Sequence, residues 1–90
     1  MATQLIIRHT VANFDAWKPL FDENQGVNKD ATLELVSLLR GLDDDNDITL
    51  IFNIGDVDKA KTLLSSDDLK QKMTAAGVTS PPNIYFGRSA

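Results

Sequence analysis

The single histidine of this 90-residue chain, His9, is the first candidate for chemistry. An imidazole titrates near neutral pH, which makes it the usual general acid or base of proteins. His9 alternates with Leu5, Ile7 and Val11, so we expect it to enter an apolar interior. A polar group there needs a partner, which is either a bound substrate or a backbone carbonyl. The sequence therefore leaves two interpretations open, a catalytic proton-transfer group and an ordinary core histidine.

A set of aromatic residues shares the predicted face of His9. Trp17 and Phe21 are one helical turn apart, and Phe52 and Phe86 belong to predicted strands. Together they could form the wall of an aromatic pocket between helix and sheet, as a flat hydrophobic ligand requires. The alternative is simple core packing, because aromatic stripes on amphipathic helices usually fill the interior.

Three arginines are candidates for holding an anion, because a guanidinium can bind a carboxylate through two parallel hydrogen bonds. Alternation along the last strand turns Arg88 inward, which makes it the candidate substrate contact. Arg8 and Arg40 are predicted on the opposite face, with Glu34 as an ion-pair partner. Asn53 shares that face and could hydrogen-bond across an interface. Pairing in solvent or between subunits is the competing interpretation.

An acidic turn invites a calcium interpretation. Asp43, Asp45 and Asp47 alternate as at the start of an EF-hand loop. However, Ile48 occupies the position that requires glycine, and Ile54 occupies that of the last bidentate ligand. We therefore predict a solvated hairpin turn and no metal site.

Composition excludes several classes of function. The chain has no cysteine, which rules out disulfides, thiol nucleophiles and cysteine-held metals. Its net charge of −4 and scattered basic residues argue against nucleic acid. It has no apolar run of the roughly 18 residues that cross a membrane, and its start does not resemble a signal peptide. We expect one domain over residues 1–90, in the cytoplasm, without a cofactor.

Two helical regions are expected between the strands. The first has an apolar stripe, made of Phe14, Trp17, Leu20, Phe21 and Val27. Asn13 or Asp15 caps it, and it decays over residues 24–30. Asp56 or Asp58 caps the second region. This region breaks near residues 65–69, where Ser66 caps a further short helix that ends at Gly77.

Four segments read as strands, at residues 4–11, 32–39, 47–54 and 83–88, with a hairpin between the second and third. The order β-α-β-β-α-β predicts an α+β fold, the ferredoxin-like plait. Its four-stranded antiparallel sheet has strand order 4-1-3-2 and helices on one face. The face expected under the helices carries Leu5, Ile7, Val11, Leu33, Leu35, Leu39, Ile48, Leu50, Phe52, Ile54, Ile84 and Phe86, and Ser37 shares its parity.

The opposite face also carries apolar side chains, namely Ile6, Val36, Leu38, Ile51 and Tyr85. Leaving them in water would forgo about 1.5–3 kcal/mol of burial for each side chain. We therefore expect a homodimer joined through this sheet face. Coverage by residues 13–31, or by a different partner, is the alternative.

The strings "RHTVANFDAWKPLFDE", "DDDND", "DKAKTLLSSDDLKQKMTAAGV" and "PPNIYFG" together resemble the dimeric α/β-barrel superfamily, particularly its small uncharacterised bacterial members. The resemblance implies a dimeric α/β barrel, but the superfamily's activities differ widely, and none of these strings is a catalytic signature. Haem-degrading members have an iron-ligating histidine on the second helix, which is missing here. Polyketide-cyclase members have a first-strand histidine that matches His9, and a second histidine that is absent.

The sequence thus predicts a protein that binds or transforms a small aromatic or carboxylated metabolite. As an enzyme it would be a cofactor-independent cyclase, isomerase or monooxygenase-like catalyst, with His9 transferring protons. The alternative is a non-catalytic ligand-binding or interaction module that uses its sheet face for assembly.

Overall fold

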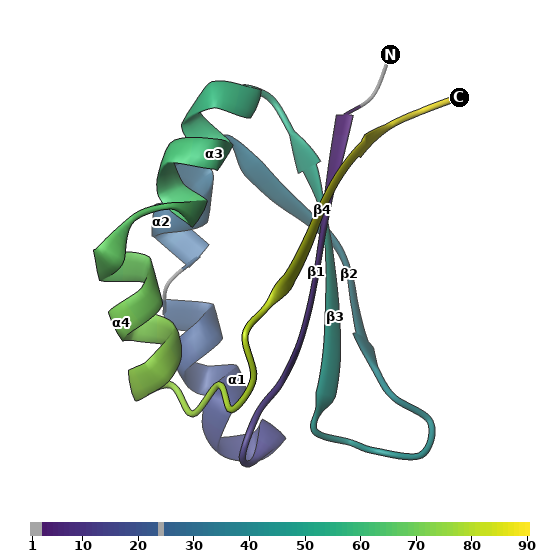
Figure 1. Ribbon diagram of the computed structural model, residues 1–90, viewed down its shortest axis with the longest axis vertical. Coiled ribbons are helices and arrows are strands. Elements are labelled where there is room, and N and C mark those ends of the chain that lie inside the picture. The colour runs from purple at the N-terminus through teal and green to yellow at the C-terminus, as the bar shows by residue number, and fades with distance from the viewer. Residues whose placement is uncertain (1–2, 24) are drawn as a thin grey trace.

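One antiparallel sheet of four strands has its helices on a single face (Figure 1). The computed structural model describes residues 3–23 and 25–90, with Val27 as backbone only, so the predicted place of the Val27 side chain lies outside the described part. The strands are β1 (Thr3–Thr10), β2 (Leu33–Arg40), β3 (Asp47–Ile54) and β4 (Asn83–Arg88). Their order, β2-β3-β1-β4, confirms the predicted ferredoxin-like plait.

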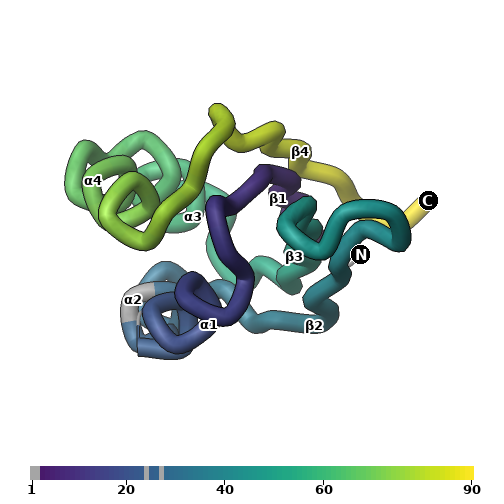
Figure 2. The backbone as a smooth tube through the Cα atoms, turned by 90° about the horizontal axis from the view of Figure 1, so that it is seen from below, coloured from purple at the N-terminus to yellow at the C-terminus, as the bar shows by residue number. Residues whose placement is uncertain are grey.

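The helices form two pairs that stand apart over the same face of the sheet (Figure 2). One pair is α1 (Phe14–Glu23) with α2 (Gln25–Asp30), and the other is α3 (Val57–Leu64) with α4 (Asp67–Ala75). The helix α2 corrects the expectation that helical structure decays over residues 24–30. Because both pairs lie on one side, the alternative in which residues 13–31 cover the opposite face is wrong.

Short polar side chains decide where the helices begin. The Asn13 side chain accepts a hydrogen bond from the Ala16 amide at 3.1 Å, so Asn13 caps α1. Asp56 caps α3 by accepting from the Lys59 amide at 3.1 Å, and Ser66 caps α4 in the same manner. Each cap satisfies an amide that has no partner within its own helix.

The end of α4 is a Schellman turn that returns the chain to the sheet. Gly77 adopts a φ of 89°, which glycine reaches without a Cβ clash. The Val78 amide donates to the Met73 carbonyl, and the Gly77 amide donates to that of Thr74. The segment then joins the end of β1 through a bridge between Val11 and Val78.

A β-bulge at Val36 changes the face assignment of half of β2. Leu35 pairs with Phe52, but Ser37 pairs with Ile51, so Val36 is the extra residue. Leu38 therefore packs on the core, whereas Leu39 is 52 % exposed. The sequence-based expectation was wrong for Leu38, Leu39 and Ser37, because strict alternation cannot anticipate an inserted residue.

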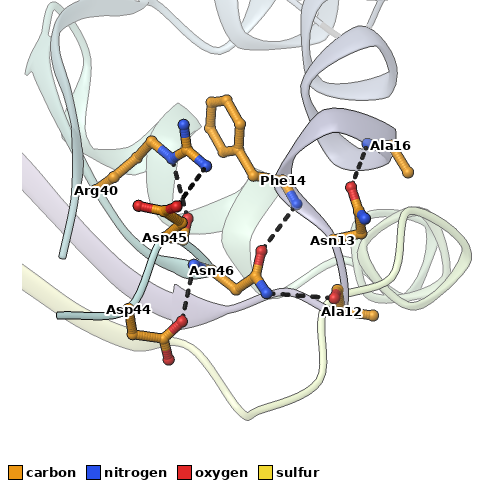
Figure 3. A network of polar contacts seen from close by, with 8 residues as sticks. All are labelled: Ala12, Asn13, Phe14, Ala16, Arg40, Asp44, Asp45 and Asn46. Atoms are coloured by element: carbon orange, nitrogen blue, oxygen red, sulfur yellow. Dashed lines mark hydrogen bonds and ion pairs between the residues drawn. The ribbon is translucent and has the colours of Figure 1, made fainter. Parts of the chain in front are cut away.

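The hairpin between β2 and β3 is fixed to the start of α1 (Figure 3). The Asn46 side chain accepts from the Phe14 amide at 2.9 Å and donates to the Ala12 carbonyl at 3.4 Å. The backbone amide of Asn46 donates to the Asp44 carboxylate at 2.9 Å. Asn46 thus satisfies a second free amide at the helix start and positions α1 over the sheet.

A second connection joins the start of β2 to the start of α3. Thr32 has a φ of 63°, an uncommon conformation for a β-branched residue. Its hydroxyl accepts from the Asp56 amide at 2.7 Å, and its carbonyl accepts from the Gly55 amide at 2.9 Å. These two bonds hold Thr32 in its left-handed conformation.

Candidate functional site

An open cleft of about 520 Å³ lies between the helices and the sheet. Its floor consists of inward-facing strand residues, namely Ile7, His9, Leu33, Leu50, Phe52 and Ile84. Residues of all four helices and of the segment after α4 form its walls. Most of the lining is apolar, as is usual for sites that take small organic ligands.

The cleft exists because the helical layer supplies too few large side chains to fill it. Every residue of α4 keeps part of its surface exposed, and its contribution to the cleft centres on Leu69 and Met73. In α3 the buried position is the small residue Ala60, and the largest fully enclosed side chains among the described residues, those of Phe52, Leu5 and Ile48, are in the sheet. A helix with so small an apolar edge remains at a distance from the strands.

One wall of the cleft is a ladder of aromatic rings. The Trp17 and Phe21 rings are stacked, with centroids 4.8 Å apart and an interplanar angle of 19°. The His9 ring meets Trp17 edge to face, with centroids 5.8 Å apart. The wall therefore offers a flat apolar surface next to a titratable group.

His9 is the polar residue of the cleft floor, and it is only 4 % exposed. Its Nδ1 atom is buried and has no hydrogen-bond partner among the described residues. Burial lowers the pKa of His9 below its usual 6.5, and this effect exceeds the opposing effects of its own backbone and of Asp47. The imidazole is therefore neutral at pH 7 and can accept a proton.

The structure brings four of the six predicted site residues to the cleft, namely His9, Trp17, Phe21 and Phe52. Phe86 packs on the core, with the Lys61 ammonium 5.6 Å from its ring centroid, and lies outside the cleft lining. Arg88 is exposed and pairs with Thr3 at the end of β4, also outside the lining. The sequence analysis missed Lys70, Lys72 and Ser80 as lining residues.

The two other arginines take different partners from those expected. Arg8 forms a two-pronged ion pair with Asp47, at 2.7 and 3.1 Å, rather than with Glu34. The Arg8 guanidinium holds the pKa of Asp47 below its usual value. Because of the bulge, Arg40 lies on the helix side of the sheet and not on the predicted interface face.

The opposite sheet face remains uncovered by any described element. Ile6 and Ile51 lie at its centre, paired across β1 and β3, and Tyr85 is 64 % exposed. Asn53 accepts a hydrogen bond from Gln4 within the same chain at 3.2 Å. This face thus combines an apolar centre with polar groups at its ends.

Two further features can be judged for the described residues. No group of three or more potential metal ligands occurs among residues 3–23 and 25–90. In the same part of the chain, no helix is long and apolar enough to cross a membrane.

Comparison with known proteins gives a fold but not a sequence family. No protein-family model matches the chain, and no curated protein matches it in sequence. Solved structures do match over nearly the whole chain. A protein from Bordetella bronchiseptica, provisionally named an antibiotic biosynthesis monooxygenase, superposes with a TM-score of 0.77 at 16 % identity, covering 99 % of this chain and 97 % of that one.

Two more matches show how widely this fold is used. SnoaB from Streptomyces nogalater, a cofactor-independent oxygenase, has a TM-score of 0.67 at 22 % identity, covering 99 % and 95 % of the two chains. A NIPSNAP family protein of unknown function from Agrobacterium tumefaciens has a TM-score of 0.70 at 13 % identity, covering 99 % and 88 %. The chain thus has the fold of the antibiotic biosynthesis monooxygenase and NIPSNAP structures, as the sequence resemblance indicated.

Proposed function

We propose that this protein binds a small, partly aromatic molecule in the cleft and transforms it by proton transfer through His9. The single observation that carries the proposal is an almost fully buried histidine, its Nδ1 without a partner among the described residues, on the floor of an apolar cleft of about 520 Å³. In an ordinary core histidine both ring nitrogens would instead be paired with groups of the protein.

The chemistry follows from the state of the imidazole. A neutral imidazole can take the proton of a phenol, an enol or a carbon next to a carbonyl. The imidazolium then returns the proton at a second atom, which isomerises or cyclises the ligand without a cofactor. With molecular oxygen as co-substrate, the same deprotonated ligand is the starting point for cofactor-independent oxygenation.

The matched structures support cofactor-independent chemistry in this fold, but they do not decide which reaction this protein performs. SnoaB is named a cofactor-independent oxygenase, and its fold spans the same length as this chain. The fold alone also hosts proteins of unknown function, such as the NIPSNAP protein. Our proposal therefore depends on the cleft and on His9 rather than on the likeness in fold.

The rival function is a binding module without catalysis. The open cleft supports a ligand in either case, so only turnover separates the two functions. Replacing His9 with Leu should abolish turnover if His9 transfers the proton. Retained turnover would remove His9 from the mechanism, whereas binding without any turnover in the parent protein would favour the module.

The experiment is a thermal-shift screen of phenols, naphthols and enolisable diketones. A ligand at a hundred times its Kd stabilises the fold by about 2.7 kcal/mol. Trp17, the sole tryptophan, lies in the cleft wall and reports binding by fluorescence.

Two neighbouring alanines at the end of α4 test where the ligand binds. Ala76→Leu should fill part of the cleft and weaken binding, whereas Ala75→Leu, at an exposed neighbour outside the lining, should not. Equal effects of the two variants would place the ligand elsewhere.

We also propose a homodimer through the uncovered sheet face. Ile6, Ile51, Leu39 and Tyr85 would otherwise remain in contact with water. Burial of such a face is worth several kcal/mol, even after allowance for partial burial. The polar groups at the ends of the face, such as the Arg8–Asp47 pair, would form the rim of the interface.

A further inference from the structure

The charge on the cleft lining differs from that of the whole chain. The chain has 13 acidic residues and only nine lysines and arginines. Nevertheless, the permanently charged side chains that line the cleft are Lys70 and Lys72 of α4, and among the described residues no carboxylate lines it. An acidic protein thus presents only positive charge to its cleft.

Both ammonium groups are available to a ligand. The ion pairs of the described residues involve Arg8, Lys18 and Arg40, and neither Lys70 nor Lys72 has a carboxylate within ion-pairing distance there. Lys72 lies in the last turn of α4, where a positive charge interacts favourably with the helix dipole. That interaction favours lysine at this position, but it does not explain why acidic residues are missing from the cleft.

A hydroxyl donor accompanies the two lysines. Ser80 lines the cleft, and its Oγ accepts a hydrogen bond from the Thr10 amide at 2.9 Å. This bond fixes the position of the oxygen and leaves the hydroxyl proton to be donated. The cleft lining thus contains two cations and one oriented hydroxyl, which are groups that stabilise a negatively charged oxygen.

We infer that the ligand of this cleft carries a negative charge, a carboxylate or an enolate, which the positive charges of Lys70 and Lys72 attract while its aromatic part lies on Trp17 and Phe21. This inference rests on the proposed function and replaces Arg88 as the anion contact. It also assigns a role to the lysines in proton transfer, because an anion formed at the ligand would be stabilised by them.

The test compares two probes of the same shape, 2-naphthoate and its neutral counterpart 2-naphthamide, by quenching of Trp17 fluorescence. The parent protein should bind naphthoate about fivefold to tenfold more tightly, as expected for two partly exposed cations. Lys70→Gln with Lys72→Gln should reduce this ratio to about one while changing naphthamide affinity less than twofold. The charge-matched control, Lys59→Gln with Lys61→Gln, removes two lysines outside the cleft and should keep the ratio.

The outcomes separate the two proposals. Binding of naphthamide with no preference for naphthoate, or a preference that survives the Lys70 and Lys72 changes, would overturn the anion inference alone. Loss of the preference in the control variant would assign it to the net charge of the protein and would overturn the inference too. Failure of both probes to bind would overturn the aromatic cleft as well.

Discussion

The guanidinium carbon of Arg40 lies 3.8 Å from the centroid of the Phe14 ring. The Arg40 Nε also donates to the Asp45 carbonyl at 3.0 Å, so one side chain joins the end of β2, the hairpin and the first turn of α1. Figure 3 shows this contact beside the Asn46 bonds. The hairpin is therefore a support for α1, the helix that carries the aromatic wall of the cleft.

Replacing Asn46 with Ala should destabilise the fold by about 1–2 kcal/mol, because the Phe14 amide loses its acceptor at a helix start. Urea unfolding followed by circular dichroism measures this change. Asp43→Ala, in the same loop but without a side-chain hydrogen bond among the described residues, should stay within about 0.5 kcal/mol of the parent. Equal losses of stability in both variants would show that the loss does not come from the hydrogen bond between Asn46 and the Phe14 amide.

Replacing Thr32 with Val should cost about 1–3 kcal/mol, because the Asp56 amide loses its acceptor while the left-handed backbone keeps its strain. The free energy of unfolding again measures the effect. Thr49→Val, on the uncovered face of β3, removes a half-buried hydroxyl in a strand and should change the free energy of unfolding by less than about 0.5 kcal/mol. An unchanged free energy of unfolding in Thr32→Val would mean that the hydrogen bond of the Thr32 hydroxyl contributes nothing to the link between β2 and α3.

Stability should depend on pH through His9. Since the pKa of His9 is lower in the folded protein, the unfolded chain binds more protons as the pH falls below about 6.5. The free energy of unfolding should therefore decrease by up to about 1.4 kcal/mol per pH unit in the window between the unfolded and folded pKa values. It should stay at its full value above the unfolded pKa.

The His9→Leu variant should lose the part of the pH dependence of stability that comes from His9 and should keep the part that comes from the carboxylates. Urea unfolding of both proteins at pH 7, 6 and 5 should therefore give curves that diverge as the pH falls. The single histidine also gives one imidazole signal for titration by NMR. Parallel stability curves, or a titration midpoint at or above 6.5, would contradict the buried neutral imidazole.

The proposed dimer can be tested by light scattering at micromolar concentration. The parent should have about twice the chain mass of 9.9 kDa. Ile51→Asp places a charge at the centre of the uncovered sheet face and should produce monomers. Ala16→Asp adds the same charge at an exposed position of α1 and should leave the dimer intact. A parent particle of 9.9 kDa would refute the assembly.

Alternation and capping residues were sufficient to predict most of the fold. The bounds of β3 and β4, the strand order and the caps Asp56 and Ser66 all agree with the structure. These features are encoded locally, by period-two patterns and by residues that satisfy free amides. The bulge in β2 is different, because it depends on how β2 pairs with β3, and no residue near Val36 signals it.

The candidate site was predictable only in part, for a related reason. His9 and Trp17 follow from the parity of β1 and the stripe of α1, and both line the cleft. Phe86 has the right parity, but the cleft reaches β4 at Ile84, one pair of residues earlier in the strand, and does not extend to Phe86. Lys70 and Lys72 could have been suspected, since they lie between the apolar residues Leu69 and Met73 on one short helix. Their exposure to a cleft depends on how far α4 lies from the sheet, which sequence spacing does not determine.

The extra residue in β2 has a consequence for how this protein can change over evolution. Deleting Val36 would leave the residues from Ser37 to Arg40 on their present sides, because Leu35 and Ser37 already pair with the consecutive residues Phe52 and Ile51. Deleting a residue between Ser37 and Leu39 would instead exchange the sides of those that follow it, so Arg40 would turn toward the uncovered face. The loss of one codon is therefore compatible with both faces of the sheet at Val36, whereas elsewhere in this half of β2 it would change the exposed surface and the support of α1 at once.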